Sequence, residues 1–349
     1  MQPLKNLELV LYRTVVPLGI ALALACPAQA QVKPLLDPKI PSYQRVGTVS
    51  GSINISGSDT MKPLTEAWSS HLRRLYPGLT IKVESKGSEA GLDALLEGKA
   101  QIAAMSRRMT QQEVVEFKRE FGYEPTEVPV AVDALAVFVH KDNPIEGLSL
   151  DQLDAMFSTE RRRGLKYPII TWGDALVLEE GWTDAPIHLY GRNGNSGTAS
   201  FFREHVLNGA ALKSSMTAGV GSASVVLEVA KDRLGVGFSG IGYQISEIRP
   251  VPLASVQGGR YVPPSFETAM EGSYPLRRNL YLYVNKPPKI TAAPSLSEYV
   301  KFVLSQQGQQ IVLTHGYYPL PTNELNRLTM MWSTPMRAAA AQEPAKFHN

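Results

Sequence analysis

Cysteine is almost absent from this chain of 349 residues, and the single one, Cys26, lies within the first thirty positions. One thiol cannot form an intramolecular disulfide, so packing and hydrogen bonds have to stabilise the fold. If the chain is cleaved after Ala30, the mature protein has no cysteine, which also excludes thiol catalysis. Lipid attachment at Cys26 stays an alternative, but Leu24 is one place off the usual lipoprotein pattern and favours a soluble product.

Charge is scarce and nearly balanced. Charged residues make up 19% of the chain, the formal net charge is +3, and the only dense basic run is 161–163. Three arginines in a row are typical of a solvated loop or a helix end. We therefore expect no nucleic-acid partner. The six histidines show no metal-ligand spacing, so we also expect no metal site and no cofactor.

Long apolar runs are absent except near the N-terminus. Lys5 and Arg13 precede an apolar stretch over 15–26, and Ala28-Gln29-Ala30 places small residues where a signal peptidase reads them. This order predicts a signal peptide over residues 1–30, with a short buried helix as the alternative. No later segment reaches the roughly 18 consecutive apolar residues of a membrane helix. We predict an exported, water-soluble protein, periplasmic or secreted after cleavage near Ala30.

Strand-like and helical patterns alternate between residues 50 and 330. Leu64, Trp68 and Leu72 share one face of a predicted helix. Such alternation is typical of an α/β fold with helices on both faces of a parallel or mixed sheet. Residues 31–50 are predicted to be a loosely ordered lead-in and 331–349 a flexible tail. The expected strands cover 53–55, 79–83, 102–105, 134–139, 186–190, 235–238 and 280–284, and the expected helices cover 64–75, 89–96, 111–121, 199–206, 224–230 and 297–313.

Three loops lead into expected helices and share one chemistry. They are Gly57-Ser58-Asp59-Thr60, Ser85-Lys86-Gly87-Ser88 and Gly194-Asn195-Ser196-Gly197-Thr198. Small residues allow a ligand close to the backbone, hydroxyls supply neutral donors, and each helix start adds free N–H groups and a positive dipole end. Helix capping alone explains any one of these loops. Three together predict an anion site at the carboxyl ends of strands.

Two arginines are candidates to complete this site. Arg192 precedes Ser196 by four residues, and Arg107 follows Ser106 at the end of a strand-like run. A guanidinium offers two parallel donors that match the oxygens of phosphate or sulfate. Ordinary solvation is the alternative for each of them.

These motifs carry a family resemblance. Gly57 to Met61, Ser106-Arg107 and Arg192 with Ser196-Gly197-Thr198 resemble the periplasmic phosphate-binding proteins of ABC transporters, in their shorter, PstS-like branch. The resemblance implies a two-lobed type II periplasmic-binding-protein fold, with mixed sheets flanked by helices and two crossover strands. One lobe would hold 50–139 plus 244–330, and the other 140–243. The likeness runs from about residue 53 to 320 and includes 170–174, 237–243, 274–276, 280–286, 304–309 and 316–320.

The resemblance also implies a function. A monomer without enzymatic activity would capture inorganic phosphate between its lobes and deliver it to an ABC permease. The longer branch of the family has carboxylates at the places of Gly194 and Arg107, which accept the proton of hydrogen phosphate and so exclude sulfate. Asp59 is the remaining nearby carboxylate, and we expect it to be the acceptor. By residue matching, the site would be lined by Ser58, Thr60, Ser88, Ser106, Arg107, Arg192, Ser196, Gly197 and Thr198.

Two other classes of function stay open. An exported phosphoesterase would use the same pocket, but it needs a nucleophile or metal set that the sequence does not display, and no Gly-x-Ser-x-Gly elbow is present. A binding or sensory protein of the same fold for another oxyanion, such as sulfate or molybdate, is left open by the missing carboxylates. The G-x-G-x-x-G pattern at 235–240 is set aside because no amphipathic helix follows it.

Overall fold

The structure, a computed structural model, describes residues 36–288 and 290–333. The predicted signal peptide and the end of the predicted tail lie outside this range. Within it, none of the helices combines the length and the apolar character needed to cross a bilayer. The strands are β1 (Gly51–Gly57), β2 (Leu79–Ser85), β3 (Ile102–Met105), β4 (Thr126–His140), β5 (Leu148–Ser149), β6 (His188–Arg192), β7 (Thr217–Gly219), β8 (Gly235–Gly240), β9 (Ile248–Pro250), β10 (Leu253–Ala254) and β11 (Arg277–Val284).

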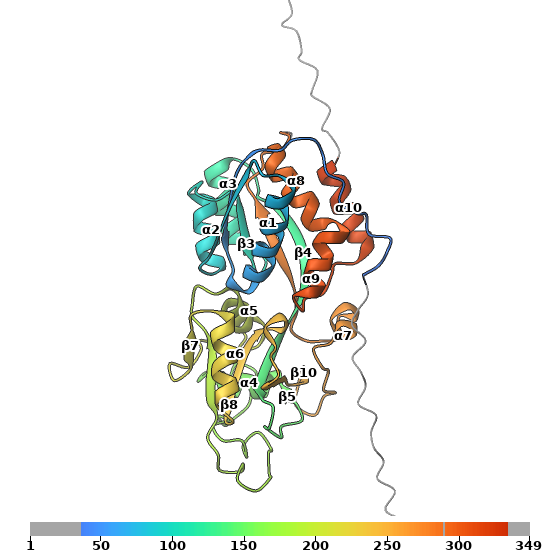
Figure 1. The fold of residues 1–349 in the computed structure, drawn as a ribbon. Coiled ribbons are helices and arrows are strands. Elements are labelled where there is room, and N and C mark those ends of the chain that lie inside the picture. The colour runs from blue at the N-terminus through green and yellow to red at the C-terminus, as the bar shows by residue number, and fades with distance from the viewer. Residues whose placement is uncertain (1–35, 289, 334–349) are drawn as a thin grey trace, which may run out of the picture. The chain divides into compact units, whose positions relative to one another are not determined.

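Nine of these strands form one mixed sheet in the described part of the chain, and β4 belongs to both of its halves (Figure 1). The first half has the order β2-β1-β3-β11-β4, with β1 parallel to β2 and β3 and with β11 antiparallel to β3 and β4. The second half has the order β4-β8-β6-β7, and β9 pairs with the end of β4. The strands β5 and β10 pair separately.

The length of β4 explains how the two halves join. Its residues 126–134 pair with β11, and its residues 135–139 pair with β8. The prediction of a strand over 134–139 therefore found only its second part. Almost all of β4 is apolar and buried, as expected for a strand covered on both faces, and the buried Asp133 is the charged exception. The change of partner falls between Ala134 and Leu135, one residue further along.

The helices pack on the sheet through apolar faces. The predicted face of α1 is confirmed, since Leu64, Trp68 and Leu72 are fully buried. Along β11, Leu280 and Leu282 join the larger core, whereas Tyr281 and Tyr283 join a smaller core beneath α2 and α3, as the period of two along a strand requires. The helices are α1 (Lys62–Leu75), α2 (Ser88–Leu96), α3 (Gln111–Phe121), α4 (Leu150–Phe157), α5 (Gly197–His205), α6 (Ser222–Lys231), α7 (Phe266–Glu271), α8 (Pro294–Leu304), α9 (Gln306–Thr314) and α10 (Thr322–Ser333).

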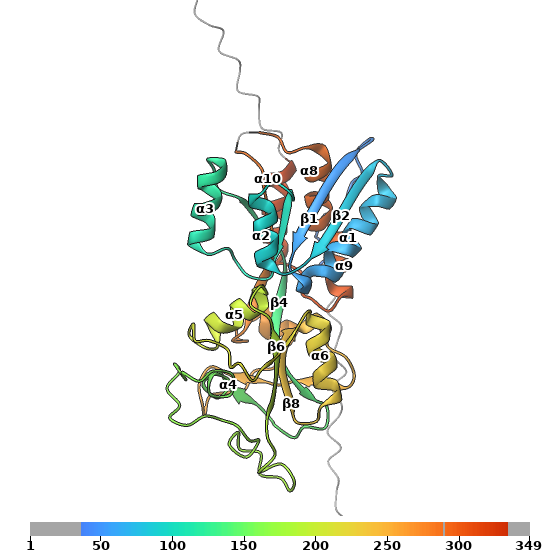
Figure 2. The same ribbon diagram turned by 90° about the vertical axis from the view of Figure 1, so that its left-hand side faces the viewer.

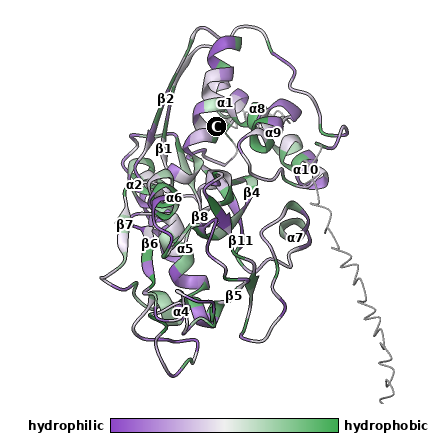
Figure 3. Cartoon of the chain, turned by 60° about the horizontal axis from the view of Figure 1, so that its bottom comes forward, coloured by the Kyte–Doolittle hydropathy of each residue, from purple (hydrophilic) through white to green (hydrophobic). Residues whose placement is uncertain are grey.

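The arrangement of helices separates the two halves of the sheet. In the second half, α5 and α6 lie on opposite sides of β6 and β8 (Figure 2). In the first half, α2 contacts β1 and β3, while α8, α9 and α10 pack together beside α1. Several helices, α1 and α8 among them, carry hydrophilic and hydrophobic residues side by side, as expected for helices that cover a core (Figure 3).

Two expectations about the ends of the fold need correction. Residues 36–50 form no helix or strand, but Ile40 and Val49 are buried, and the hydroxyl of Tyr43 donates to Glu298 at 2.5 Å. This part of the lead-in is therefore packed against the fold rather than loose. The single helix predicted over 297–313 is two helices, because Ser305 ends α8 and caps α9 by accepting the N–H of Gly308.

Candidate anion-binding site

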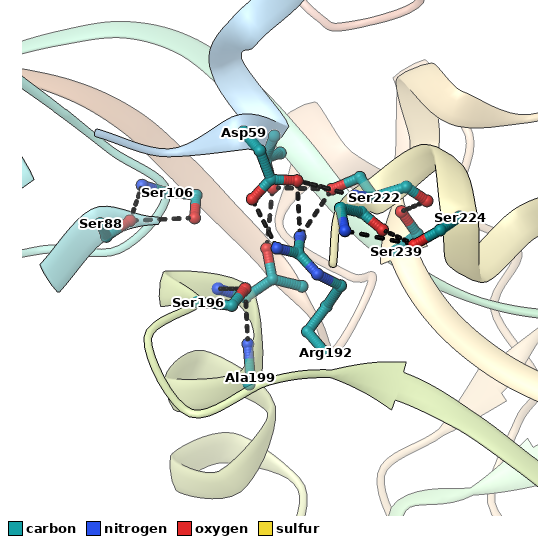
Figure 4. A network of polar contacts seen from close by, with 12 residues as sticks. Asp59, Ser88, Ser106, Arg192, Ser196, Ala199, Ser222, Ser224 and Ser239 are labelled. Carbon is teal, nitrogen blue, oxygen red and sulfur yellow. Dashed lines mark hydrogen bonds and ion pairs between the residues drawn. The ribbon is translucent and has the colours of Figure 1, made fainter. Parts of the chain in front are cut away.

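The three predicted loops meet at one place in the structure. Each follows the carboxyl end of a strand: β1 leads into the short 3-10 helix η1 (Asp59–Met61), β2 into α2, and β6 into α5. A fourth start, that of α6 after β7, joins them. The side chains from these elements face one another around Asp59 and Arg192 (Figure 4). Every predicted site residue with a polar side chain is buried.

Asp59 and Arg192 form a bidentate ion pair between the two halves of the sheet. Nη2 of Arg192 lies 2.6 Å from Oδ1 of Asp59, and Nη1 lies 2.7 Å from Oδ2. The same Oδ2 accepts the backbone N–H of Ser222 at 2.7 Å and its hydroxyl at 2.9 Å. Arg192 is 2% exposed and Asp59 9%. The pair is thus almost removed from solvent, where charge-assisted hydrogen bonds are strong.

Hydroxyl groups continue the network away from this pair. Oγ1 of Thr60 lies 2.9 Å from Oγ1 of Thr198 and 3.2 Å from Oγ of Ser222. Arg192 also donates to the hydroxyl of Ser222 at 3.0 Å. Each hydroxyl has one proton and can accept as well, so this cluster can turn its protons toward an anion.

Ser88, Ser106 and Gly197 form the other side of the site. The backbone N–H of Ser106 donates to Oγ of Ser88 at 3.1 Å, and Ser196 caps α5 by accepting the N–H groups of Thr198 and Ala199. A Cβ atom on Gly197 would come within 2.3 Å of the Ser88 hydroxyl. Only glycine fits there, and the N-terminus of α5 can therefore approach the start of α2 closely.

Ser58 and Arg107 stand apart from this network. Ser58 is buried just before η1, where its backbone N–H donates to Ala104 O at 2.7 Å. The guanidinium of Arg107 makes a bidentate ion pair with Glu113, at 2.6 and 2.7 Å. Burial lowers the pKa of Arg107, but the hydrogen bond and charge of Glu113 outweigh it, and the net shift is upward. Among the described residues, the Arg107 side chain bonds only to Arg108 O and to Glu113, and to none of the other predicted ligands, so its role as a ligand stays a prediction.

Four further polar residues belong to the neighbourhood and were not predicted. Two of them have recognisable signals in the sequence: Gly221-Ser222 opens a helix with small residues, as the other three loops do, and Asp133 interrupts an apolar run. The other two are Arg278 and Tyr243. Arg278 bonds to Asp133 and to Thr198. Tyr243 donates its hydroxyl to Asp59 O at 2.6 Å. Burial, followed by the charge of Asp59, raises the pKa of Tyr243 well above its ordinary value, so it stays a proton donor.

An open cavity of about 650 Å³ leads to this network from solvent. Its lining includes Asp59 and Ser222 together with Lys62, Glu66 and His315. A second cavity, of about 350 Å³, is lined by His188 and Tyr190 of β6 together with Lys213, and it includes none of the predicted site residues. Within the described range, no three side chains of His, Cys, Asp or Glu gather as a metal site would require.

Comparisons with known proteins show which family the chain resembles. The model of the PBP superfamily domain matches residues 44–307. The phosphate-binding protein PstS of Pseudomonas aeruginosa is 44% identical over 286 residues, which cover 82% of this chain and 88% of that protein. Protein SphX of a Synechocystis strain is 30% identical, over 79% of this chain and 81% of its own. A solved structure from Clostridium perfringens, described as a putative phosphate ABC transporter substrate-binding protein with bound phosphate, is 26% identical, has a TM-score of 0.65, and matches over 78% of this chain and 100% of its own.

Proposed function

The chain belongs to the PBP superfamily, and from that premise we propose that it captures inorganic phosphate and delivers it to an ABC permease. The observation that carries the proposal is the meeting of four helix starts around Arg192, in a chain 44% identical to a phosphate-binding protein. Helix N-termini and hydroxyls bind a tetrahedral oxyanion without much net positive charge. No catalytic step belongs to this function.

We assign the ligand contacts to nine of the ten predicted residues. Hydroxyls and backbone N–H groups surround the anion, and the guanidinium of Arg192, paired with Asp59, adds charge-assisted donors. Both arginines pair with an acid, but the pair of Arg192 and Asp59 lies inside the network, whereas the pair of Arg107 and Glu113 makes no bond to it, so Arg107 is left out. The assigned residues are Ser58, Asp59, Thr60, Ser88, Ser106, Arg192, Ser196, Gly197 and Thr198.

Asp59 is the acceptor that we propose for the proton of hydrogen phosphate. Its Oδ2 accepts three hydrogen bonds, whereas Oδ1 accepts one, from Arg192. A carboxylate oxygen has room for a second hydrogen bond. Sulfate has no proton to donate there and would place two acceptors against each other, which costs free energy.

The two lobes meet at β4 and β11. Pairing with β8 begins at Leu135, and β9 and β10 still pair with strands of the second lobe. We therefore place the second lobe at about 135–254, rather than at 140–243, and the return of the chain to the first lobe at 255–276. Closure of the lobes around a dehydrated anion is the proposed mechanism.

We also propose that the protein acts outside the cytoplasm, as a monomer, after removal of residues 1–30. The basic residues, the apolar stretch and the small residues before position 31 support cleavage near Ala30. Intact-mass measurement of the exported protein tests this: an N-terminus at Gln31 is expected, and retention of residues 1–30 would contradict it.

Isothermal titration calorimetry tests the binding. The mature protein is freed of bound anion by unfolding and refolding, and is then titrated with phosphate and with sulfate. Saturable one-to-one binding of phosphate is expected, with no heat from sulfate and none from Arg192→Ala. Arg249→Ala is a matched control, because this half-buried arginine donates to the carbonyl oxygens of Asn143 and Ile145. Folded wild-type protein that binds sulfate or molybdate instead of phosphate would refute the proposal.

A further inference from the structure

A second buried arginine lies one hydrogen bond from the proposed ligands. Arg278 is on β11, opposite Asp133 on β4, and the two side chains are 3% and 0% exposed. Nε of Arg278 donates to Oδ2 of Asp133 at 2.8 Å, and Nη2 lies at 2.8 Å from the same oxygen. The two strands that join the lobes are thus linked by an ion pair at the point where β4 changes partner.

Asp133 extends this link into the second lobe. Its other oxygen, Oδ1, accepts the backbone N–H of Ile241 at 3.1 Å, directly after β8. A buried carboxylate is stable only when its oxygens are bonded. Here Oδ2 is bonded to β11 of the first lobe, and Oδ1 is bonded to the end of β8 in the second lobe. The charge of Arg278 is neutralised by this partner, so attraction of an anion by net charge is not its contribution.

The contact between Arg278 and Thr198 fixes the polarity of a hydroxyl. Nη2 of Arg278 lies 3.0 Å from Oγ1 of Thr198, and a guanidinium donates but never accepts. Thr198 must therefore accept this bond, which leaves its single proton for another acceptor. In the structure its other neighbour is the hydroxyl of Thr60 at 2.9 Å. A bound oxyanion is a stronger acceptor than a hydroxyl.

The guanidinium also keeps an unsatisfied donor. Nη1 of Arg278 is buried and has no hydrogen-bond partner among the described residues. A buried N–H without a partner costs free energy, and native proteins rarely keep one without a use. The ring of Phe201, on the same helix as Thr198, lies 5.4 Å from this guanidinium. Arg278 is thus held by an acid on one strand and by helix α5 on the other side.

We propose that Arg278, held by Asp133, is a positioning residue of the anion site. It fixes Thr198 as a hydrogen-bond donor to the bound anion and ties that donor to the strands that join the lobes. The inference rests on the proposed function, since it concerns the same phosphate site. Donor bonds in series strengthen one another, so loss of Arg278 should weaken phosphate binding through Thr198.

A double-mutant cycle tests this dependence. Phosphate affinity is measured by calorimetry for wild type, Arg278→Gln, Thr198→Val and the double variant. We expect about 10- to 100-fold weaker binding in each single variant, as for loss of a hydrogen bond to a charged group, and little further loss in the double variant. The single variant Thr198→Ser, in which Arg278 is unchanged, keeps the hydroxyl. It should therefore keep most of the wild-type phosphate affinity that Thr198→Val loses. Losses that multiply in the double variant would overturn the inference.

Folding is controlled separately. Arg278→Gln leaves Asp133 buried and without its ionic partner, so the pair Asp133→Asn with Arg278→Gln is measured as well, because two amides remove the lone charge. The pair should fold and still bind phosphate at least tenfold more weakly, whereas Arg249→Gln should bind as wild type does. If this double variant folds and binds phosphate as tightly as the wild type, the positioning role of Arg278 is refuted, while the proposed function stands. Absence of phosphate binding by the wild type would instead refute the proposed function and this inference with it.

Discussion

Replacement of Asp59 by asparagine should change which anion the protein selects. The carboxylate accepts four hydrogen bonds, three at Oδ2 and one at Oδ1. An asparagine oxygen in the place of Oδ2 keeps three of them. The amide nitrogen in the place of Oδ1 cannot accept the N–H of Arg192, and it cannot accept the proton of hydrogen phosphate either.

The size of the effect follows from what differs between the two anions. At pH 8 phosphate and sulfate are both mainly dianions, because inorganic phosphate loses its second proton near neutral pH. Removing the negative charge of Asp59 therefore strengthens the binding of phosphate and of sulfate by a similar factor, and this factor cancels in the ratio of the two affinities. The lost hydrogen bond affects phosphate alone. A bond to a charged group contributes about 1.5–3 kcal/mol, so the preference for phosphate should fall about 10- to 150-fold.

Calorimetric titration of Asp59→Asn with phosphate and with sulfate at pH 8 measures this ratio. Asp154→Asn is the matched control, since this fully buried carboxylate accepts bonds from Ser158 and from the backbone of Arg163, within the second lobe. The control should lose stability but keep the anion preference. If Asp59→Asn keeps its phosphate affinity and still rejects sulfate, Asp59 is not the proton acceptor.

Three further predictions concern packing and charge near the site. Gly197→Ala should weaken phosphate binding at least about tenfold, because its Cβ would lie 2.3 Å from the Ser88 hydroxyl and 2.8 Å from that of Ser106. Calorimetry measures the loss, and near-normal affinity would mean that the helix start has room for a Cβ atom. Arg107→Gln should lower the melting temperature but change phosphate affinity less than about threefold, and a loss as large as that of Arg192→Ala would make it a ligand after all. Burial raises the pKa of Glu113, but the hydrogen bonds from Arg107 and Thr110 and the charge of Arg107 together outweigh it, and the net pKa is lowered. The stabilisation is therefore present above about pH 4.5 and lost as pH falls, so the difference in urea stability between wild type and Glu113→Gln should shrink between pH 7 and pH 3.5; a constant difference would contradict this.

Much of the fold could be read from local patterns. The strand over 102–105 and the helix over 111–121 were predicted with the bounds that the structure gives. Both are short elements with clear limits, and the helix begins with a capping box in which Thr110 accepts the N–H of Glu113. Local signals of this kind do not depend on the rest of the chain. The first half of β4 was missed because β11, far away in sequence, is the strand that holds it in the sheet.

The site shows the same division between local and distant information. Hydroxyls and glycines at helix starts are visible in the sequence, so most of the lining residues were expected. The partners of the charged groups were not, because Arg107 pairs with Glu113, six residues later in the first turn of α3, while Asp133 pairs with Arg278, which is 145 residues away. Sequence spacing alone does not decide between a free arginine and a neutralised one. For Arg278 the register of β11 against β4 decides this, because it places the arginine opposite Asp133, and that register is known only from the structure.

The place of β11 has a consequence for how the chain folds. Strand β3 ends at Met105, but its neighbour in the sheet is completed only at Val284, after the whole second lobe has been made. A chain that emerges from its N-terminus therefore presents β3 as an open edge for most of its synthesis. Pairings this distant in sequence form slowly, and an unpaired edge is where strands of other chains attach. Completion of the first lobe thus waits for the last strand, and until then its exposed edge favours association with other chains.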